Sequence, residues 1–182
     1  METITLPHLP NTPIQVCLFN HVQNSTFLRQ QLLEGNKDFE YAFLDASVLI
    51  STSHVLAACF KAISDSLNGR LKTRNVHSEI VFALSPNNNI AESFRRFGIQ
   101  DTSTSVVAIK VLNSPDQSFA EHLLENVQGS PVALTDDALA AVKDDARIRK
   151  LYRLDQPKKG ESAVLGKEAE AFIIGSMALK GT

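Results

Sequence analysis

Apolar residues recur at helical spacing most regularly over residues 52–68, where positions three and four apart are apolar. Asn68-Gly69 follows this stripe as a stop signal. Residues 24–34 show the same spacing, open on cap-type residues and close on Gly35. The pattern therefore predicts one helix over 52–68 and another over 24–34.

Further helical patterns follow in the second half of the chain, at 118–127, in short pieces over 135–150 and over 162–179. The last of these carries a broad apolar stripe that consists of Val164, Leu165, Ala169, Phe172, Ile173 and Met177. A stripe of this width is typical of a terminal helix that faces the core. It also suits a helix that keeps part of its apolar face for a partner. The sequence leaves both interpretations open.

Short apolar segments predict strands at 3–6, 14–20, 41–45, 78–85 and 104–112. The run "SEIVFALS" at 78–85 is largely apolar, as in a central strand that is buried on both faces. A helix at 89–98 and the strand at 104–112 follow it, which predicts a βαβ-like unit with parallel or nearly adjacent strands. We expect a single α/β or α+β domain over residues 1–182, with a mixed sheet flanked by helices.

The composition is that of an ordinary globular protein, with 43% hydrophobic residues, 21% charged residues and a formal net charge of −2. Any contact with nucleic acid must therefore come from a local basic patch. Cys17 and Cys59 lie in apolar surroundings, which favours two buried free thiols, with a disulfide as the alternative. The sequence shows neither a secretory signal nor a membrane-spanning run, so we expect a soluble intracellular protein.

Three consecutive asparagines, Asn87 to Asn89, follow Ser85-Pro86. Asn89 is placed to cap a helix, because Glu92 then occupies the third helical position of a capping box. Gly98 would end this helix as a left-handed stop. Capping does not explain Asn87 and Asn88, which form either a solvated turn or an amide-lined loop suited to phosphates and base edges.

Two basic runs are candidates for nucleic-acid contact. In "RLKTR" (70–74), Lys72 and Arg74 alternate, so an extended backbone would project both from one face. In "RIRKLYR" (147–153), the apolar positions are spaced as on a helix, which leaves three basic residues outside: Arg147, Lys150 and Arg153. Solvated surface is the simpler interpretation of each run.

Motifs that would indicate catalysis are missing from the sequence. It has no Walker A loop and no GxSxG, and the HxE spacing of His77 and Glu79 lacks the PCxxC of zinc deaminases. We therefore expect no catalytic residue, no metal and no cofactor. The alternative is a small α/β enzyme that acts on a nucleotide or RNA substrate in a pocket at Asn87 and Asn88.

Two stretches resemble a known family: "LKTRNVHSEIVFALSPNNNIAESFRRFGI" (71–99) and "IRKLYRL" (148–154). The order of KTR, SE with an apolar run, LSPNNNI and FGI resembles the TPRKB family, the small KEOPS/EKC-complex subunit that binds the PRPK-type kinase. The length and the helical end of the chain fit the same family. His77 departs from the pattern, because a small polar residue is expected there.

The resemblance implies a non-catalytic subunit that binds the atypical kinase of the complex directly and the other KEOPS subunits indirectly. It also implies binding of the tRNA 3′ CCA end, in support of N6-threonylcarbamoyladenosine formation at tRNA position 37. The complex in fungi is linked to telomere maintenance and transcription, so nucleus and cytoplasm are the implied locations. The resemblance implies no membrane association.

Site residues follow from mapping the resemblance onto this chain. Lys72 and Arg74 would contact phosphates, which position a nucleic acid without reading its sequence. The other residues expected at the tRNA site are Asn87, Asn88 and Arg95. The kinase interface is expected on residues 148–154 and the C-terminal helix, at Tyr152, Phe172, Ile173 and Met177.

Overall fold

A computed structural model describes residues 1–114, 118–160 and 162–180, which are built around one five-stranded sheet. The strands are β1 (Glu2–Ile4), β2 (Ile14–Asn20), β3 (Ala42–Asp45), β4 (Val106–Val111) and β5 (Ser130–Val132). Their order is β1-β2-β4-β3, and β5 pairs with β2 beyond the end of β1. The pairings are all antiparallel. The α+β class is therefore confirmed, whereas the expected mixed sheet with parallel strands is wrong.

Helices cover both faces of this sheet. Their bounds are α1 Ser25–Glu34, α2 Thr52–Leu67, α3 Val76–Leu84, α4 Ile90–Phe97, α5 Ala120–Asn126, α6 Asp136–Ala140, α7 Asp145–Tyr152 and α8 Lys167–Ala178, with short 3-10 turns η1 Lys37–Phe39 and η2 Ala46–Val48. The helices predicted over 24–34, 52–68 and 118–127 are thus confirmed as α1, α2 and α5. The predicted helix over 162–179 begins only at Lys167.

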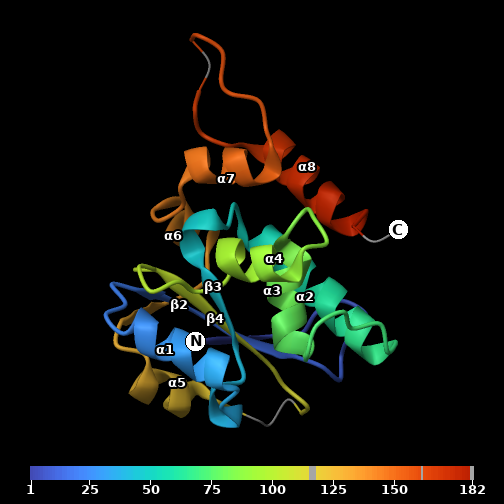
Figure 1. Ribbon diagram of the computed structural model, residues 1–182, viewed down its shortest axis with the longest axis vertical. Helices are drawn as coiled ribbons and strands as arrows, with labels where there is room; N and C mark the ends of the chain where they lie inside the picture. The colour runs from blue at the N-terminus through green and yellow to red at the C-terminus, as the bar shows by residue number, and fades with distance from the viewer. Residues whose placement is uncertain (115–117, 161, 181–182) are drawn as a thin grey trace.

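Successive side chains of a strand point to opposite faces of the sheet, so the strands contribute to two separate cores. α1 and α5 cover the smaller one, which includes Phe19 and Phe43 of the sheet. α2, α3 and α8 cover the larger one, which includes Leu18, Leu44 and Ile109. Figure 1 shows α1 and α5 at the lower left, and α7 and α8 together at the opposite, upper end of the molecule.

The segment predicted as a central strand is the helix α3. Seven of its 9 residues are buried: His77, Glu79, Ile80, Val81, Phe82, Ala83 and Leu84. A helix buried on nearly all sides lacks the polar face that reveals its period, so its sequence resembles a buried strand. Its local signal is Asn75, whose Oδ1 accepts a hydrogen bond from the Ser78 backbone N–H at 2.8 Å. The expected βαβ-like unit therefore does not form.

The two cysteines lie in different cores. Cys17 belongs to the smaller core and Cys59 to the larger one, and both are free and buried. The prediction of two buried thiols is therefore confirmed. In the part of the chain that the structure describes, no group of three or more potential metal ligands comes together. None of the helices there has the length and apolar character that crossing a bilayer requires.

Candidate functional site

A cleft of about 510 Å³ lies beside β3, the edge strand of the sheet. α1 and the turn after it form one wall, and α3 and α4 form the other. Its apolar lining includes Leu32, Phe39, Val81, Phe94 and Ile99. Ligand pockets typically measure about 300–1,000 Å³, so this cleft is large enough for a group the size of a nucleobase.

Positive charge dominates the polar part of the cleft. Four cationic residues line it: Arg29, Lys37, Arg74 and Arg95. Among the described lining residues, Glu40 is the one acid. A local surplus of this kind attracts phosphate even though the chain has a formal net charge of −2. The sequence did not single out Arg29 and Lys37, because only the fold places α1 and the turn after it opposite α3 and α4.

Arg74 reaches the cleft across the end of α1. Gly35 follows this helix with φ at +69°, and a Cβ on it would lie 3.0 Å from Nη1 of Arg74. Glycine suits this position for two reasons: it adopts the left-handed conformation without strain, and it leaves room for the guanidinium group. The C-terminal cap of α1 thereby helps to place an arginine of the cleft.

Arg95 lies on α4, with 72% of its side chain exposed. Its Nη2 atom is 3.7 Å from Oε1 of Glu92, which also pairs with Arg96. Exposed pairs of this kind contribute little free energy. The Arg95 side chain can therefore turn toward an anion in the cleft at small cost.

His77 forms part of the cleft wall and is 6% exposed. Its Nε2 accepts a hydrogen bond from the Val111 backbone N–H at 3.0 Å, which assigns the proton of the neutral ring to Nδ1. Burial, together with the positive charge of Lys110, lowers the pKa of His77 to about 3. The imidazole is therefore neutral, and the charge of the cleft comes from the arginines and Lys37.

The three asparagines have different surroundings. Asn89 caps α4, since its Oδ1 accepts a hydrogen bond from the Glu92 backbone N–H at 3.0 Å. Asn87 supports this cap: its Oδ1 accepts from the Asn89 backbone N–H, and its Nδ2 donates to Glu92 Oε2, both at 3.0 Å. The expectation that capping leaves Asn87 unexplained is therefore wrong. Asn88 is exposed.

Gly98 does not end α4 in the expected left-handed conformation, because its φ is −75°. Glycine is needed there for a different reason. A Cβ at this position would lie 2.7 Å from the carbonyl oxygen of Phe94, which is closer than van der Waals contact allows.

The residues expected at a tRNA site separate into two groups. Arg74 and Arg95 line the cleft together, although they come from different segments of the chain. Lys72 is exposed on the loop that carries Arg74, outside the lining. Asn87 and Asn88 also lie outside it. A pocket at the two asparagines, as the enzyme alternative requires, therefore does not coincide with this cleft.

The residues expected at a kinase interface separate in a similar way. Phe172 is 57% exposed, whereas Ile173 and Met177, on the same helix, are 0% and 2% exposed and belong to the larger core. Tyr152 is also buried, and its hydroxyl donates to the Leu84 carbonyl at 2.5 Å. Burial gives these three a structural role. Direct contact with a partner through α8 stays a prediction, and Phe172 is the residue that carries it.

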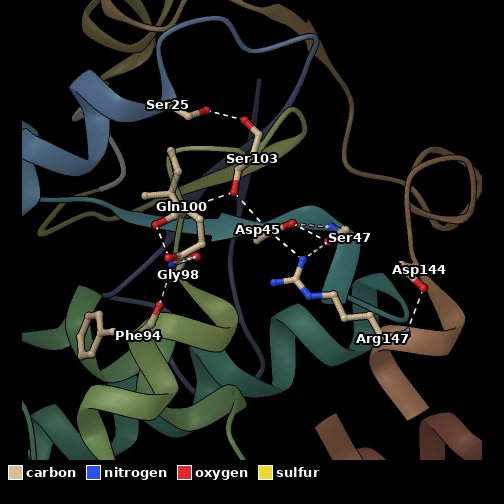
Figure 2. Close-up of polar contacts among 10 residues, drawn as sticks. Ser25, Asp45, Ser47, Phe94, Gly98, Gln100, Ser103, Asp144 and Arg147 are labelled. Carbon is tan, nitrogen blue, oxygen red and sulfur yellow. Dashed lines mark hydrogen bonds and ion pairs between the residues drawn. The ribbon is translucent and has the colours of Figure 1, made fainter. Parts of the chain in front are cut away.

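The second basic run is partly used inside the fold. Arg147 of α7 points toward the end of β3, where its Nη1 donates to Asp45 Oδ2 at 3.1 Å and to Ser47 Oγ at 2.8 Å (Figure 2). Arg149 donates to the backbone carbonyls of Asp155 and Ala163. These contacts make Arg147 and Arg149 structural residues, whereas Lys150 and Arg153 of the same run are exposed.

Comparison with known proteins agrees with the resemblance found in the sequence. Residues 19–181 match the family described as Kinase binding protein CGI-121. The EKC/KEOPS complex subunit cgi121 of Aspergillus fumigatus is 51% identical over 185 residues, with 100% of this chain and 97% of the relative covered. Its counterpart in Schizosaccharomyces pombe is 31% identical over 177 residues, with 97% and 98% covered. The chain therefore belongs to the CGI-121 family of kinase-binding proteins.

Proposed function

We propose that this protein is the kinase-binding subunit of an EKC/KEOPS complex and that it holds the single-stranded 3′ CCA end of tRNA in the cleft beside β3. It performs no chemistry itself, and it supports N6-threonylcarbamoyladenosine formation by the complex. Membership of the CGI-121 family and full-length similarity to EKC/KEOPS subunits support the kinase-binding part. Nuclear and cytoplasmic locations, and links to telomeres and transcription, follow from this role as further parts of the proposal.

The observation that carries the RNA part is the combination of cations and apolar surface in one cleft. Single-stranded RNA ends are bound through phosphate contacts and through bases that stack on aromatic side chains. Arg74 and Arg95 supply the first kind of contact, and Phe94, on the α4 wall, is a half-buried aromatic side chain for the second. The proposed ligand is a single-stranded end and not a duplex, so a compact cleft is sufficient to bind it.

The test measures binding of a labelled single-stranded RNA that ends in CCA, over a series of salt concentrations. We expect Arg74→Ala and Arg95→Ala each to weaken binding and to lower the slope of log K against log salt by about 0.7 per lost phosphate contact. Arg70→Ala is the matched control. Arg70 precedes Arg74 on the same loop, but it pairs with Asp65 and lies outside the cleft.

Wild-type binding by both cleft variants would reject the RNA site. An equal loss in Arg70→Ala would show that the chain attracts RNA through general charge alone. Shortening the RNA by its CCA end distinguishes end recognition from binding along the strand, because only end recognition loses affinity with those nucleotides. Turnover of a nucleotide or of tRNA by the purified chain would favour the enzyme alternative.

A further inference from the structure

The loop that presents Lys72 and Arg74 is attached to a buried carboxylate. Glu79 lies on α3 and is 3% exposed. Its Oε2 accepts hydrogen bonds from the backbone N–H groups of Lys72 at 3.0 Å and Thr73 at 2.9 Å, and from the Thr73 hydroxyl at 2.6 Å. Three donors on one oxygen fix the Lys72–Thr73 peptide in one orientation. The side chains on either side, Lys72 and Arg74, both remain exposed.

A buried cation lies against the helix that carries Glu79. This cation is Lys180, at the end of the described C-terminal segment. It is 8% exposed, its Nζ donates to the Phe82 carbonyl at the end of α3, and it lies 3.2 Å from the centre of the Phe82 ring. Burial lowers the pKa of Lys180 to about 8, and the negative charge of Glu79 opposes this decrease. Lys180 thus docks on the end of α3, the helix that carries Glu79.

We infer that Glu79 is the positioning residue of the RNA-end site and that Lys180, which docks on the same helix, supports it. This inference rests on the proposed function, because it concerns the same RNA site. Neither residue touches the RNA. Glu79 holds the loop so that Arg74 enters the cleft across Gly35, and Lys180 holds the end of the helix that carries Glu79.

Thr73→Val gives the mildest test, since it removes one hydroxyl and keeps the shape of the side chain. We expect the labelled CCA-ended RNA to bind about three- to tenfold more weakly, because one hydrogen bond to a charged acceptor is lost. Thr52→Val is the matched control. Thr52 also donates its hydroxyl to a carboxylate, that of Asp136 at 2.8 Å, but it lies outside the cleft, so RNA binding should not change.

Glu79→Gln and Lys180→Met test the two buried charges. We expect each to weaken RNA binding at least as much as Thr73→Val does, and Lys180→Arg to restore most of the affinity because it keeps the positive charge. General destabilisation alone does not predict that RNA affinity is lost in Lys180→Met and restored in Lys180→Arg. Combining Thr73→Val with Glu79→Gln should add little to Glu79→Gln alone, because both substitutions break the same attachment.

The results separate this inference from the proposed function. If Arg74→Ala binds RNA normally, the proposed site is wrong. If Arg74→Ala loses affinity while Thr73→Val and Glu79→Gln keep it, the site stands and the positioning role of Glu79 is rejected. If Lys180→Met alone binds normally, the part assigned to Lys180 is rejected. If either charge variant fails to fold, Thr73→Val and its control still decide the role of Glu79.

Discussion

Asp45 and Arg147 form an ion pair that joins the end of β3 to α7, with 3.1 Å between Oδ2 and Nη1 (Figure 2). Asp45 is the less exposed partner, at 8% of its side chain against 37% for Arg147. The carboxylate also accepts hydrogen bonds from the hydroxyls of Ser47 at 2.6 Å and Ser103 at 3.1 Å. Three segments that are distant in sequence therefore meet at one carboxylate.

Arg147→Met should destabilise the protein, since it removes the cation and leaves Asp45 buried with only neutral donors. A fully buried pair costs about 3–5 kcal/mol to break, and we expect about 1–3 kcal/mol here because Arg147 is partly exposed. Urea unfolding measures the loss. Lys150→Met changes an exposed cation on the same helix and should stay within about 0.5 kcal/mol of the wild type. Equal losses in the two variants would contradict a specific role for the pair.

Local patterns predicted most of the helices and strands, because α1, α2, α5, β2 and β4 show their periods or apolar runs openly. α3 was missed for a physical reason: its environment is apolar on nearly all sides, so the helical period disappears. The expected βαβ-like unit disappears with this correction, since a helix and not a strand directly precedes α4. Asn75 is the local signal that could have predicted α3, because its side chain caps the start of this helix at the Ser78 backbone N–H.

Only two of the four cationic residues that line the cleft could be predicted from the sequence. Arg74 was identified because it lies in a basic run, and Arg95 because it lies within the stretch that resembles the family. Arg29 lies on an ordinary amphipathic helix, and nothing local distinguishes it from a solvated arginine. Exposure could not be read from the apolar stripe of α8 either, since Phe172 and Ile173 are neighbours that face solvent and core, respectively.

Acidification should destabilise the protein through two buried histidines. Burial lowers the pKa of His54 to about 4, against the opposing effect of the Glu170 charge, and lowers that of His77 to about 3. Both values lie below the ordinary value of about 6.5 that applies to the unfolded chain. Below that pH the unfolded state binds protons that the folded state does not, so the free energy of unfolding falls as pH falls.

The expected loss approaches about 1.4 kcal/mol per pH unit for each histidine between about pH 6 and pH 4. Urea unfolding at several pH values measures this slope, and His54→Gln should reduce it by about half. An unchanged slope in this variant would show that His54 does not contribute. The surroundings of His54 explain this prediction. Nδ1 of His54 accepts a hydrogen bond from the Ile50 backbone N–H at 3.3 Å, and Nε2 lies 2.9 Å from the Tyr152 hydroxyl. A second ring proton, on Nδ1, would therefore have no acceptor.

The asparagines should differ in their effect on stability. Asn87→Ala and Asn89→Ala should each lower the free energy of unfolding by about 1 kcal/mol, because both side chains satisfy the start of α4. Asn88→Ala should have an effect within about 0.5 kcal/mol, as is usual for an exposed position. Urea unfolding of the three variants measures these changes, and a large loss in Asn88→Ala would show that the loop depends on that side chain.

Kinase docking should depend on the outer face of α8. Phe172→Glu places a charge on an apolar side chain that is 57% exposed, so we expect kinase affinity to fall at least about tenfold while the melting temperature stays unchanged. Leu124→Glu is the matched control. It introduces the same charge at a side chain that is 51% exposed on α5, at the opposite end of the molecule (Figure 1). Calorimetry or a pull-down with the PRPK-type kinase gives the comparison.

Ile173→Glu completes the comparison, because its outcome separates folding from docking. This side chain is fully buried, so an ionised carboxylate there should destabilise the chain by several kcal/mol and lower its melting temperature. Loss of kinase binding in this variant then reflects unfolding, whereas loss in a stable Phe172→Glu protein reflects an interface. Normal kinase binding by Phe172→Glu would place the interface elsewhere on the surface. Equal losses in Phe172→Glu and Leu124→Glu would show that added negative charge, rather than contact at α8, weakens the complex.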